Sequence, residues 1–233
     1  MRHLLGLIVC VLPIWASAAS LDVDPIRVTF SAKNTVAVLT LTNAGTAPAT
    51  VQLEPVAWSQ DKGEDVYVPS RDLLATPPIF TVPAGGKQIV RLGLRVPPSA
   101  KQELSYRLYL QEVPQATANQ GLGVVMALRI GVPVFVEPAV AAKPVMGWTV
   151  KRLSDKQIEL SAANNGNAHI LIHDIKLSGP DKVSLAPQQA AYILPAKAHT
   201  WVLQSPRPLP AGAQLQLDAD SDAGELHAKL VLQ

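Results

Sequence analysis

The longest alternation of apolar and mixed side chains in the chain runs from Leu122 to Val136 and reads LGVVMALRIGVPVFV. Every second position in this stretch is apolar: Leu122, Val124, Met126, Leu128, Ile130, Val132, Val134 and Val136. A period of two over this length predicts a β-strand with one continuous apolar face. At ~3.3 Å per residue the strand would extend over about 50 Å, although strands typically have only about 5–6 residues.

Pro133 lies inside this stretch and indicates where the strand sits in its sheet. Proline cannot donate to a strand ladder, so it suits an edge strand or a bulge. A long apolar edge is a template for pairing with other chains. We therefore predict that this strand is displayed for pairing with a strand of another chain. The alternative is a strand that bends between two sheets and is internal throughout.

Shorter strands are predicted on both sides of this stretch. Five precede it: 21–30, 35–43, 51–58, 88–96 and 104–113. Segment 73–82, which carries Pro77-Pro78, should also be extended. Seven follow it: 148–153, 157–162, 170–177, 191–194, 200–204, 214–218 and 226–232. Regular short strands separated by Gly, Pro and Asn turns predict an all-β protein with a β-sandwich in each half. The Ala- and Pro-rich segment 139–147 is the expected linker, between a first domain at 19–138 and a second at 148–233.

The N-terminus has the pattern of an export signal. Arg2 and His3 precede an apolar run, and Ala16-Ser17-Ala18 follows it. This pattern predicts a secretory signal peptide over residues 1–18, cleaved after Ala18 or Ala19. A membrane anchor is the alternative, but the run is shorter than the ~20 residues that a span needs. Cys10 is the only cysteine, so the exported chain would have no disulfide.

Composition and motifs argue against several classes of function. The net charge of +2 gives no argument for binding nucleic acid or a membrane surface. We find no nucleophile elbow, zinc-protease motif or phosphate-binding loop, and predict no enzyme, metal or cofactor. His169 and His173 would lie ~13 Å apart on a strand, too far to share an ion, and are expected in turns or at the surface. The carboxylates Glu64–Asp65 and Asp218, Asp220 and Asp222 are expected to be solvated turn residues, with a weak calcium site at the latter as the alternative.

Several segments, in their order and spacing, resemble the PapD-like periplasmic chaperones of the chaperone–usher pilus pathway. They are PIRVTF (25–30), PIFTVPAGGKQIVRLGLRVPP (78–98), SYRLYLQEVP (105–114), LRIGVPVFVEP (128–138) and AANNGNAHILIHDI (162–175). The resemblance implies two immunoglobulin-like domains in an L-shaped arrangement, which bind pilus subunits in the periplasm and deliver them to an outer-membrane usher. Donor-strand complementation is the implied mechanism, in which a chaperone strand fills the open groove of an incomplete subunit sandwich.

The same resemblance implies roles for particular residues. The donor strand would insert Leu122, Val124, Met126, Leu128 and Ile130 into the subunit. Arg27 matches an arginine that grips the C-terminal carboxylate of the subunit.

Two positions depart from the family pattern. Pro133 occupies the place of the second gripping residue, a lysine, so Arg129 or Arg107 is the candidate substitute. Glu137 occupies the place of an arginine that locks the two domains, so that lock is expected to be altered or absent.

Two further expectations remain open at this stage. An exposed apolar edge on the donor strand predicts self-association of the free protein through this edge. The alternative to an assembly chaperone is a secreted two-domain β-sandwich module that binds carbohydrate or a cell surface. Such sites usually display aromatic side chains, and aromatic residues make up only 5% of the chain.

Overall fold

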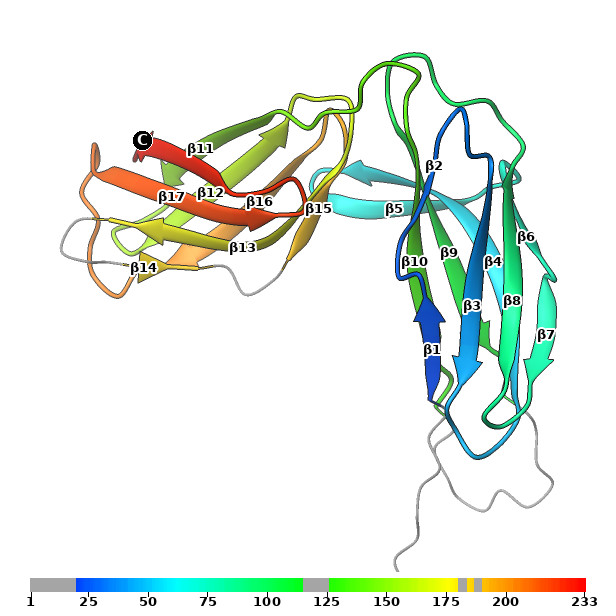
Figure 1. Ribbon diagram of the computed structural model, residues 1–233. Helices are drawn as coiled ribbons and strands as arrows, with labels where there is room; N and C mark the ends of the chain where they lie inside the picture. The colour runs from blue at the N-terminus through cyan, green and yellow to red at the C-terminus, as the bar shows by residue number, and fades with distance from the viewer. Residues whose placement is uncertain (1–19, 115–125, 180–183, 187–189) are drawn as a thin grey trace, which may run out of the picture.

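The computed structural model describes residues 20–114, 126–179, 184–186 and 190–233, and its elements in these ranges are all strands. The strands form two β-sandwich units that meet at a corner, so that the molecule has the shape of an L (Figure 1). The first unit contains β1 to β10 and the second contains β11 to β18. The all-β, two-sandwich class predicted from the alternation is therefore confirmed. Within the described residues, no helix is long and apolar enough to cross a membrane.

The first unit packs a sheet of four strands against a sheet of six. The four-stranded sheet has the order β1 (Leu21–Asp24), β3 (Val36–Asn43), β8 (Lys87–Leu94), β6 (Leu73–Thr76). The other sheet has the order β2 (Val28–Phe30), β10 (Arg129–Val136), β9 (Leu104–Glu112), β4 (Ala49–Asp61), β5 (Glu64–Pro69), and β7 (Ile79–Val82) also pairs with β4. Alternate residues of the two inner faces form one apolar core, as expected for an aligned sandwich.

Two segments, one predicted as a single strand and one predicted to be extended, are each divided between the two sheets. The opening segment 21–30 forms β1 in one sheet and β2 in the other, with Pro25 between them. Segment 73–82 likewise forms β6 and β7, and it breaks at Pro77-Pro78. Proline has no backbone N–H and cannot continue a ladder, so the chain leaves one sheet there and joins the other.

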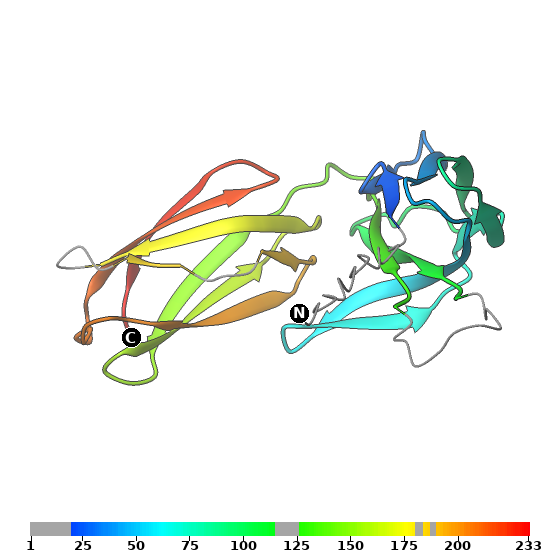
Figure 2. The same ribbon diagram turned by 90° about the horizontal axis from the view of Figure 1, so that it is seen from below.

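The second unit has a three-stranded and a five-stranded sheet. The first contains β11 (Met146–Arg152), β12 (Gln157–Asn164) and β16 (Ala198–Gln204). The second contains β14 (Ser184–Leu185), β13 (Ile170–Ser178), β17 (Gln214–Ser221) and β18 (Leu226–Val231), and β15 (Ala191–Ile193) pairs with β13. Seen from below, the first unit is viewed end-on, and the segment from β10 to β11 connects it to the second unit (Figure 2).

Each unit has a buried asparagine at the end of one of its early strands, and its side chain holds the turn that follows. In the first unit Asn43 Nδ2 donates to the carbonyls of Ala47 (2.8 Å) and Val82 (3.1 Å). In the second, Asn164 Nδ2 donates to the carbonyls of Ala168 (2.7 Å) and Ile193 (3.1 Å). Buried polar groups must be hydrogen-bonded, so each amide pins its turn to a neighbouring strand. The sequence signals at these places are the Asn-containing turns.

Candidate functional site

Strand β10 has an open edge along its first half. On one side its residues 129–136 pair antiparallel with β9. On the other side only Val134, Phe135 and Val136 pair with a strand, the short parallel β2. No strand among the described residues pairs with positions 129–133 on that side. Pro133 is therefore at an edge, as predicted, and a stretch of β10 can accept a strand from another molecule.

The predicted apolar stripe divides into a buried part and an exposed part. Val132, Val134 and Val136 belong to the core of their own unit, and Ile130 packs partly against it. Met126 and Leu128 precede the strand and are 88% and 36% exposed.

The prediction of one strand over 122–136 is thus wrong at positions 126–128, because β10 begins at Arg129. Leu122 and Val124 lie outside the described residues.

The opposite face of β9 and β10 looks toward the inner side of the L and presents Arg107. Arg107 is the direct cross-strand partner of Pro133. Gly131, the next residue on the same face, leaves room for this side chain: a Cβ there would lie 3.0 Å from Arg107 Cδ and 3.0 Å from Tyr109 Cε1. The missing side chain at position 131 therefore determines where Arg107 and Tyr109 can lie.

The Arg107 guanidinium is held by aromatic rings. Its central carbon lies 4.4 Å from the centroid of the Trp58 ring and 5.5 Å from that of Tyr67. Stacking of this kind favours arginine over lysine. Arg107 Nε is buried without a hydrogen-bond partner, and Arg107 forms no ion pair among the described residues. The Arg107 guanidinium is therefore a positive charge held in place by the rings, with N–H groups available to donate hydrogen bonds.

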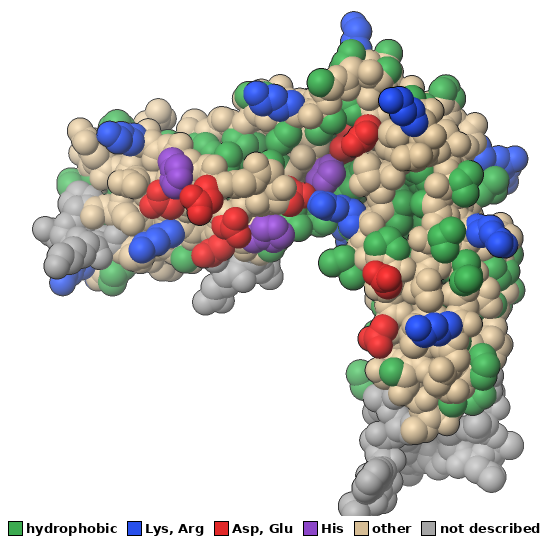
Figure 3. Space-filling view, viewed as in Figure 1, with side chains coloured by type: hydrophobic (Ala, Val, Ile, Leu, Met, Phe, Trp, Pro, Cys, Tyr) green, Lys and Arg blue, Asp and Glu red, His purple; other side chains and the backbone are tan. Residues whose placement is uncertain are grey.

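A pocket beside Arg107 lies between the two units. Leu171 and Tyr192 line it from the second unit, and Asp65 lines it from the first. The Asp65 carboxylate is already used, because it accepts hydrogen bonds from Trp58 Nε1 (2.9 Å), Gln60 Nε2 (3.0 Å) and Tyr67 OH (2.8 Å). Charged and histidine side chains gather at this inner corner (Figure 3). The pocket thus brings side chains of both units around an available cation.

Tyr192 reports on the electrostatics of the corner. Burial raises the pKa of its phenol above the ordinary value of 10.0, and Asp222 acts in the same direction. Arg27 and Arg107 oppose that shift, because both cations favour the phenolate. Two arginines therefore act on one tyrosine in the corner, although burial and Asp222 outweigh them and the pKa of Tyr192 stays raised.

Arg27 is not free in this structure. Its Nη1 lies 2.5 Å from Asp222 Oδ2, and the Arg27 side chain is 40% exposed. Asp222 was expected to be a solvated turn residue, but its side chain is only 16% exposed. That expectation is wrong, because the corner brings the end of β17 against the start of β2.

Arg129 lies on the open part of β10. Its Nη2 forms an ion pair of 2.9 Å with Glu54 Oε2, and its guanidinium lies 3.8 Å from the centroid of the Tyr109 ring. Both ion-pair partners are about half exposed. Of the three arginines singled out in the sequence, Arg27 and Arg107 act on the corner at Tyr192, whereas Arg129 is paired along the sheet surface.

An aromatic cluster joins the two units at the corner. Trp58 and Phe135 of the first unit are buried with Leu194 of the second, and Tyr67 and Tyr192 pack around them. Gln60 adds polar links: its Nε2 donates to the Tyr192 carbonyl (2.8 Å) and its Oε1 accepts from Leu194 N (3.0 Å). The contact between the units thus has its own small apolar core, fixed by a buried amide.

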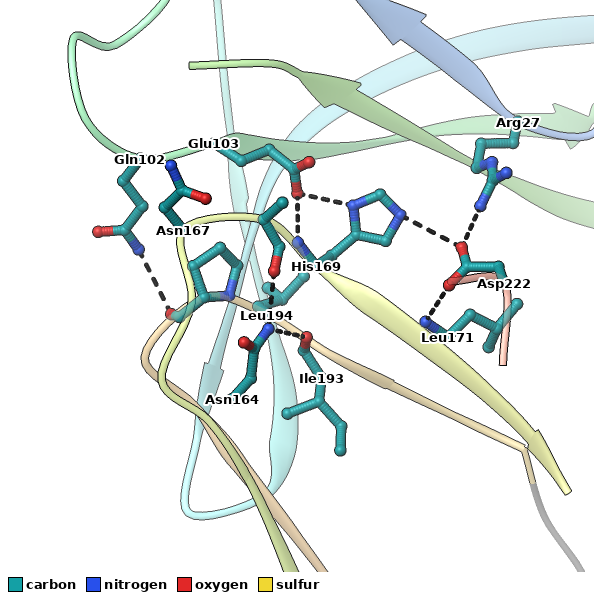
Figure 4. A network of polar contacts seen from close by, with 12 residues as sticks. Arg27, Gln102, Glu103, Asn164, Asn167, His169, Leu171, Ile193, Leu194 and Asp222 are labelled. Atoms are coloured by element: carbon teal, nitrogen blue, oxygen red, sulfur yellow. Dashed lines mark hydrogen bonds and ion pairs between the residues drawn. The ribbon is translucent and has the colours of Figure 1, made fainter. Parts of the chain in front are cut away.

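A histidine network completes the corner (Figure 4). His169 Nδ1 lies 2.7 Å from Glu103 Oε1, and the His169 backbone N–H donates to the same oxygen at 3.1 Å. The imidazole stacks on Phe135, with ring centroids 3.4 Å apart and planes at 7°. Its Nε2 lies 3.7 Å from Asp222 Oδ2.

The expectation of a surface histidine is therefore wrong for His169, because contacts across the corner cover its side chain to 12% exposure. Glu137 is exposed and takes no part in the network. The only sequence signal for the network was an isolated carboxylate, Glu103, at the start of an apolar strand.

Comparison with family models gives a match over residues 20–142, described as pili and flagellar-assembly chaperone, PapD N-terminal domain. The chain belongs to the PapD-like assembly chaperone family. The resemblance read from the sequence is confirmed, and the alternative of a carbohydrate- or surface-binding module is not favoured. Comparison with curated protein sequences finds no significant match.

Solved structures of PapD-like chaperones have the same fold. A chain of the CsuC–CsuE chaperone–tip adhesion subunit complex from the archaic Csu pili of Acinetobacter baumannii is 22% identical, with 92% of this chain and 100% of that chain covered and a TM-score of 0.68. A chain of the Salmonella enterica SafA pilin–SafB chaperone complex is 17% identical (92% and 98% covered, TM-score 0.64). The YadV chaperone is 19% identical (90% and 99% covered, TM-score 0.63).

Proposed function

We propose that this PapD-like chaperone stabilises pilus subunits by donor-strand complementation through the open edge of β10. The observation that carries the proposal is the unpaired side of positions 129–133, next to exposed Met126 and Leu128. A subunit strand paired there would satisfy its own backbone groups and extend the sheet. The apolar residues 122, 124, 126, 128 and 130 would then fill the subunit core, each contributing about 1.5–3 kcal/mol if fully buried.

The subunit carboxylate is proposed to bind at the corner, between Arg27 and Arg107. Arg107 stands across β9–β10 from Pro133, the position at which the family resemblance implies the second gripping residue. Its guanidinium is stacked on Trp58 and has a buried Nε with no partner among the described residues. Arginine can hold a carboxylate by two parallel hydrogen bonds. We assign the second anchor to Arg107 rather than Arg129, which is paired with Glu54.

The test is coexpression with a pilus subunit encoded beside the chaperone, followed by affinity capture of the chaperone. The proposal expects a soluble one-to-one complex that is lost when β10 cannot pair, for instance in a variant that carries prolines at Ala127 and Arg129. Capture of equal amounts of subunit by that variant would contradict it. Prolines placed at Val36 and Val38, on exposed positions of the other sheet, serve as the control for general damage.

The site of action and the domain limits follow from the same proposal. The protein would be exported to the periplasm, lose residues 1–18, fold as domains 19–138 and 148–233 joined by 139–147, and deliver subunits to an outer-membrane usher. The family match beginning at residue 20 supports this. N-terminal sequencing of exported protein should begin at Ala19 or Ser20, and a start at Met1 would contradict it.

Self-association of the free chaperone through the β10 edge is part of the same proposal. Met126, at 88% exposed, and Leu128 lie next to unpaired backbone, and such edges associate. Sedimentation of the free protein should show a dimer that dissociates when subunit is added. A monomer at all concentrations would contradict this part alone.

A further inference from the structure

The Arg27 guanidinium is already occupied by a carboxylate of the chaperone itself. Asp222, which directly follows β17 in the second unit, places Oδ2 2.5 Å from Arg27 Nη1. Its other oxygen, Oδ1, accepts the backbone N–H of Leu171 at 2.9 Å, and its own N–H donates to the Leu171 carbonyl at 3.1 Å. The aspartate is thus fixed by β13 and points its carboxylate across the corner (Figure 4).

Asp222 also has a second group within reach. His169 Nε2 lies 3.7 Å from the same Oδ2, while His169 Nδ1 is held by Glu103. If Arg27 turned away from Asp222, the aspartate would keep its Leu171 contacts and remain beside the imidazole. The Arg27 side chain is 40% exposed, so an external carboxylate can approach it from the open side. Asp222 therefore keeps polar partners when Arg27 is released.

We infer that Asp222 is an internal competitor for Arg27, which occupies the guanidinium until the carboxylate of a subunit replaces it. The inference rests on the proposed carboxylate anchor. Two carboxylates on one guanidinium repel each other, so the incoming anion and Asp222 exclude one another in part. The Arg27–Asp222 pair links β2 to the second unit, so the exchange also removes one interdomain tie. Subunit capture at Arg27 is thereby coupled to loosening of the corner.

The opposite role for Asp222 is to position Arg27 for the ligand, and the two roles predict opposite effects. Asp222→Asn keeps the size of the side chain and an oxygen for the Leu171 N–H but removes the charge. Competition predicts that this variant binds a carboxylate more tightly. Positioning predicts weaker binding. Asp220→Asn removes an exposed charge two residues away and is the matched control.

The experiment is a titration of the purified protein, labelled with ¹⁵N-arginine, with N-acetylleucine and with its uncharged amide. The side-chain Nε–Hε signals of Arg27 and Arg107 report binding at each position. We expect N-acetylleucine but not the amide to shift both signals, and Asp222→Asn to lower the half-saturating concentration about two- to fivefold, the range for a partly exposed ion pair. Asp220→Asn should leave it unchanged.

Two other results have separate meanings. Equal or weaker binding by Asp222→Asn, with the Arg107 shift intact, overturns the competition and leaves the anchor standing. The absence of a carboxylate-specific shift at Arg107 in all three proteins overturns the proposed anchor, and the competition with it. The arginine spectra before ligand is added show whether each variant is folded.

Discussion

Pro133 of β10 lies directly across the strand pair from Arg107 of β9. The proline side chain at position 133 cannot carry a charge, whereas its cross-strand partner Arg107 carries a positive charge. Both face the corner where the second unit supplies Tyr192 and Asp222. The proposed anchor therefore stays at the same place on the sheet surface although the residue that provides it has moved to the adjacent strand.

Replacement of Arg107 by Gln tests this relocation. Loss of a charge-assisted, two-pronged hydrogen bond should cost about 2 kcal/mol of subunit binding, or about thirtyfold in affinity. The free energy of unfolding should fall by only about 0.5–1 kcal/mol, because Arg107 loses its stacking on Trp58 but has no ion pair to lose among the described residues. Competition binding with a cognate subunit and chemical denaturation measure the two effects. Arg91→Gln, at an exposed position on the other sheet, is the control, and equal binding by both variants would exclude Arg107.

Gly131 offers an independent test that leaves the arginine in place. In Gly131→Ala the added Cβ would stand 3.0 Å from both Arg107 Cδ and Tyr109 Cε1, so these side chains must shift. Overpacking of this kind typically costs about 1–3 kcal/mol, and we expect weaker subunit binding together with a small loss of stability. The control is Gly93→Ala in β8 of the four-stranded sheet, where an added Cβ would meet no atom within 4 Å. This variant should leave subunit binding and stability unchanged. Unchanged binding by Gly131→Ala would mean that the position of Arg107 is unimportant.

The two parts of the apolar stripe should respond differently to a charge. Met126→Asp alters a side chain that is 88% exposed and should change the free energy of unfolding by less than about 0.5 kcal/mol, yet abolish subunit capture. Val134→Asp places a charge at a fully buried position and should cost more than about 3 kcal/mol. Thermal melting and coexpression separate the effects. Unfolding of Met126→Asp would show that this residue belongs to the chaperone's own core.

Tyr106 provides a test of the first unit at alkaline pH. Burial, the strongest cause, and the neighbouring Asp72 raise the pKa of its phenol well above 10.0, and its hydroxyl donates to Asp72 at 3.1 Å. A raised pKa in the folded state contributes stability that is complete below the unfolded value of about 10 and is lost as the pH rises above it.

Tyr106→Phe should therefore cost about 0.5–1.5 kcal/mol at neutral pH and reduce the fall of stability above pH ~10. The pKa of Tyr67 is also raised, mainly by burial, so this residue would still cause part of the loss of stability above pH ~10. Urea unfolding of both proteins across this pH range measures the difference. Parallel stability curves would contradict the assignment.

The sequence predicted the architecture because strand alternation is a local property. Val132, Val134 and Val136 share a face whatever surrounds them, and their burial follows from that alternation. Alternation did not reveal where the strand ladder ends, so residues 126–128 were assigned to a strand that begins at Arg129. It also missed the change of sheet at Pro25 and at Pro77-Pro78, since each half of those segments is extended.

The corner was less predictable, because its contacts join residues far apart in the chain. His169 and Glu103 are 66 positions apart, and Arg27 and Asp222 are 195 apart. Nothing in the spacing of His169 and His173 distinguishes a surface histidine from one stacked on Phe135. The family resemblance did indicate a departure at Glu137, but it could not say that His169 would bridge carboxylates of the two units instead.

Hydrogen exchange of the chaperone, free and in complex with a subunit, is the most direct measurement of the central claim that β10 donates its edge. The account predicts that the backbone amides of residues 127, 129 and 131 exchange slowly in the complex and faster in the free protein, because a subunit strand then pairs with them. The alternate amides already face β9, since Glu112 N–H donates to the Leu128 carbonyl. The four-stranded sheet β1-β3-β8-β6 should show no such change. Unchanged exchange at residues 127, 129 and 131, with protection on the four-stranded sheet, would place the subunit on the other face and contradict the account.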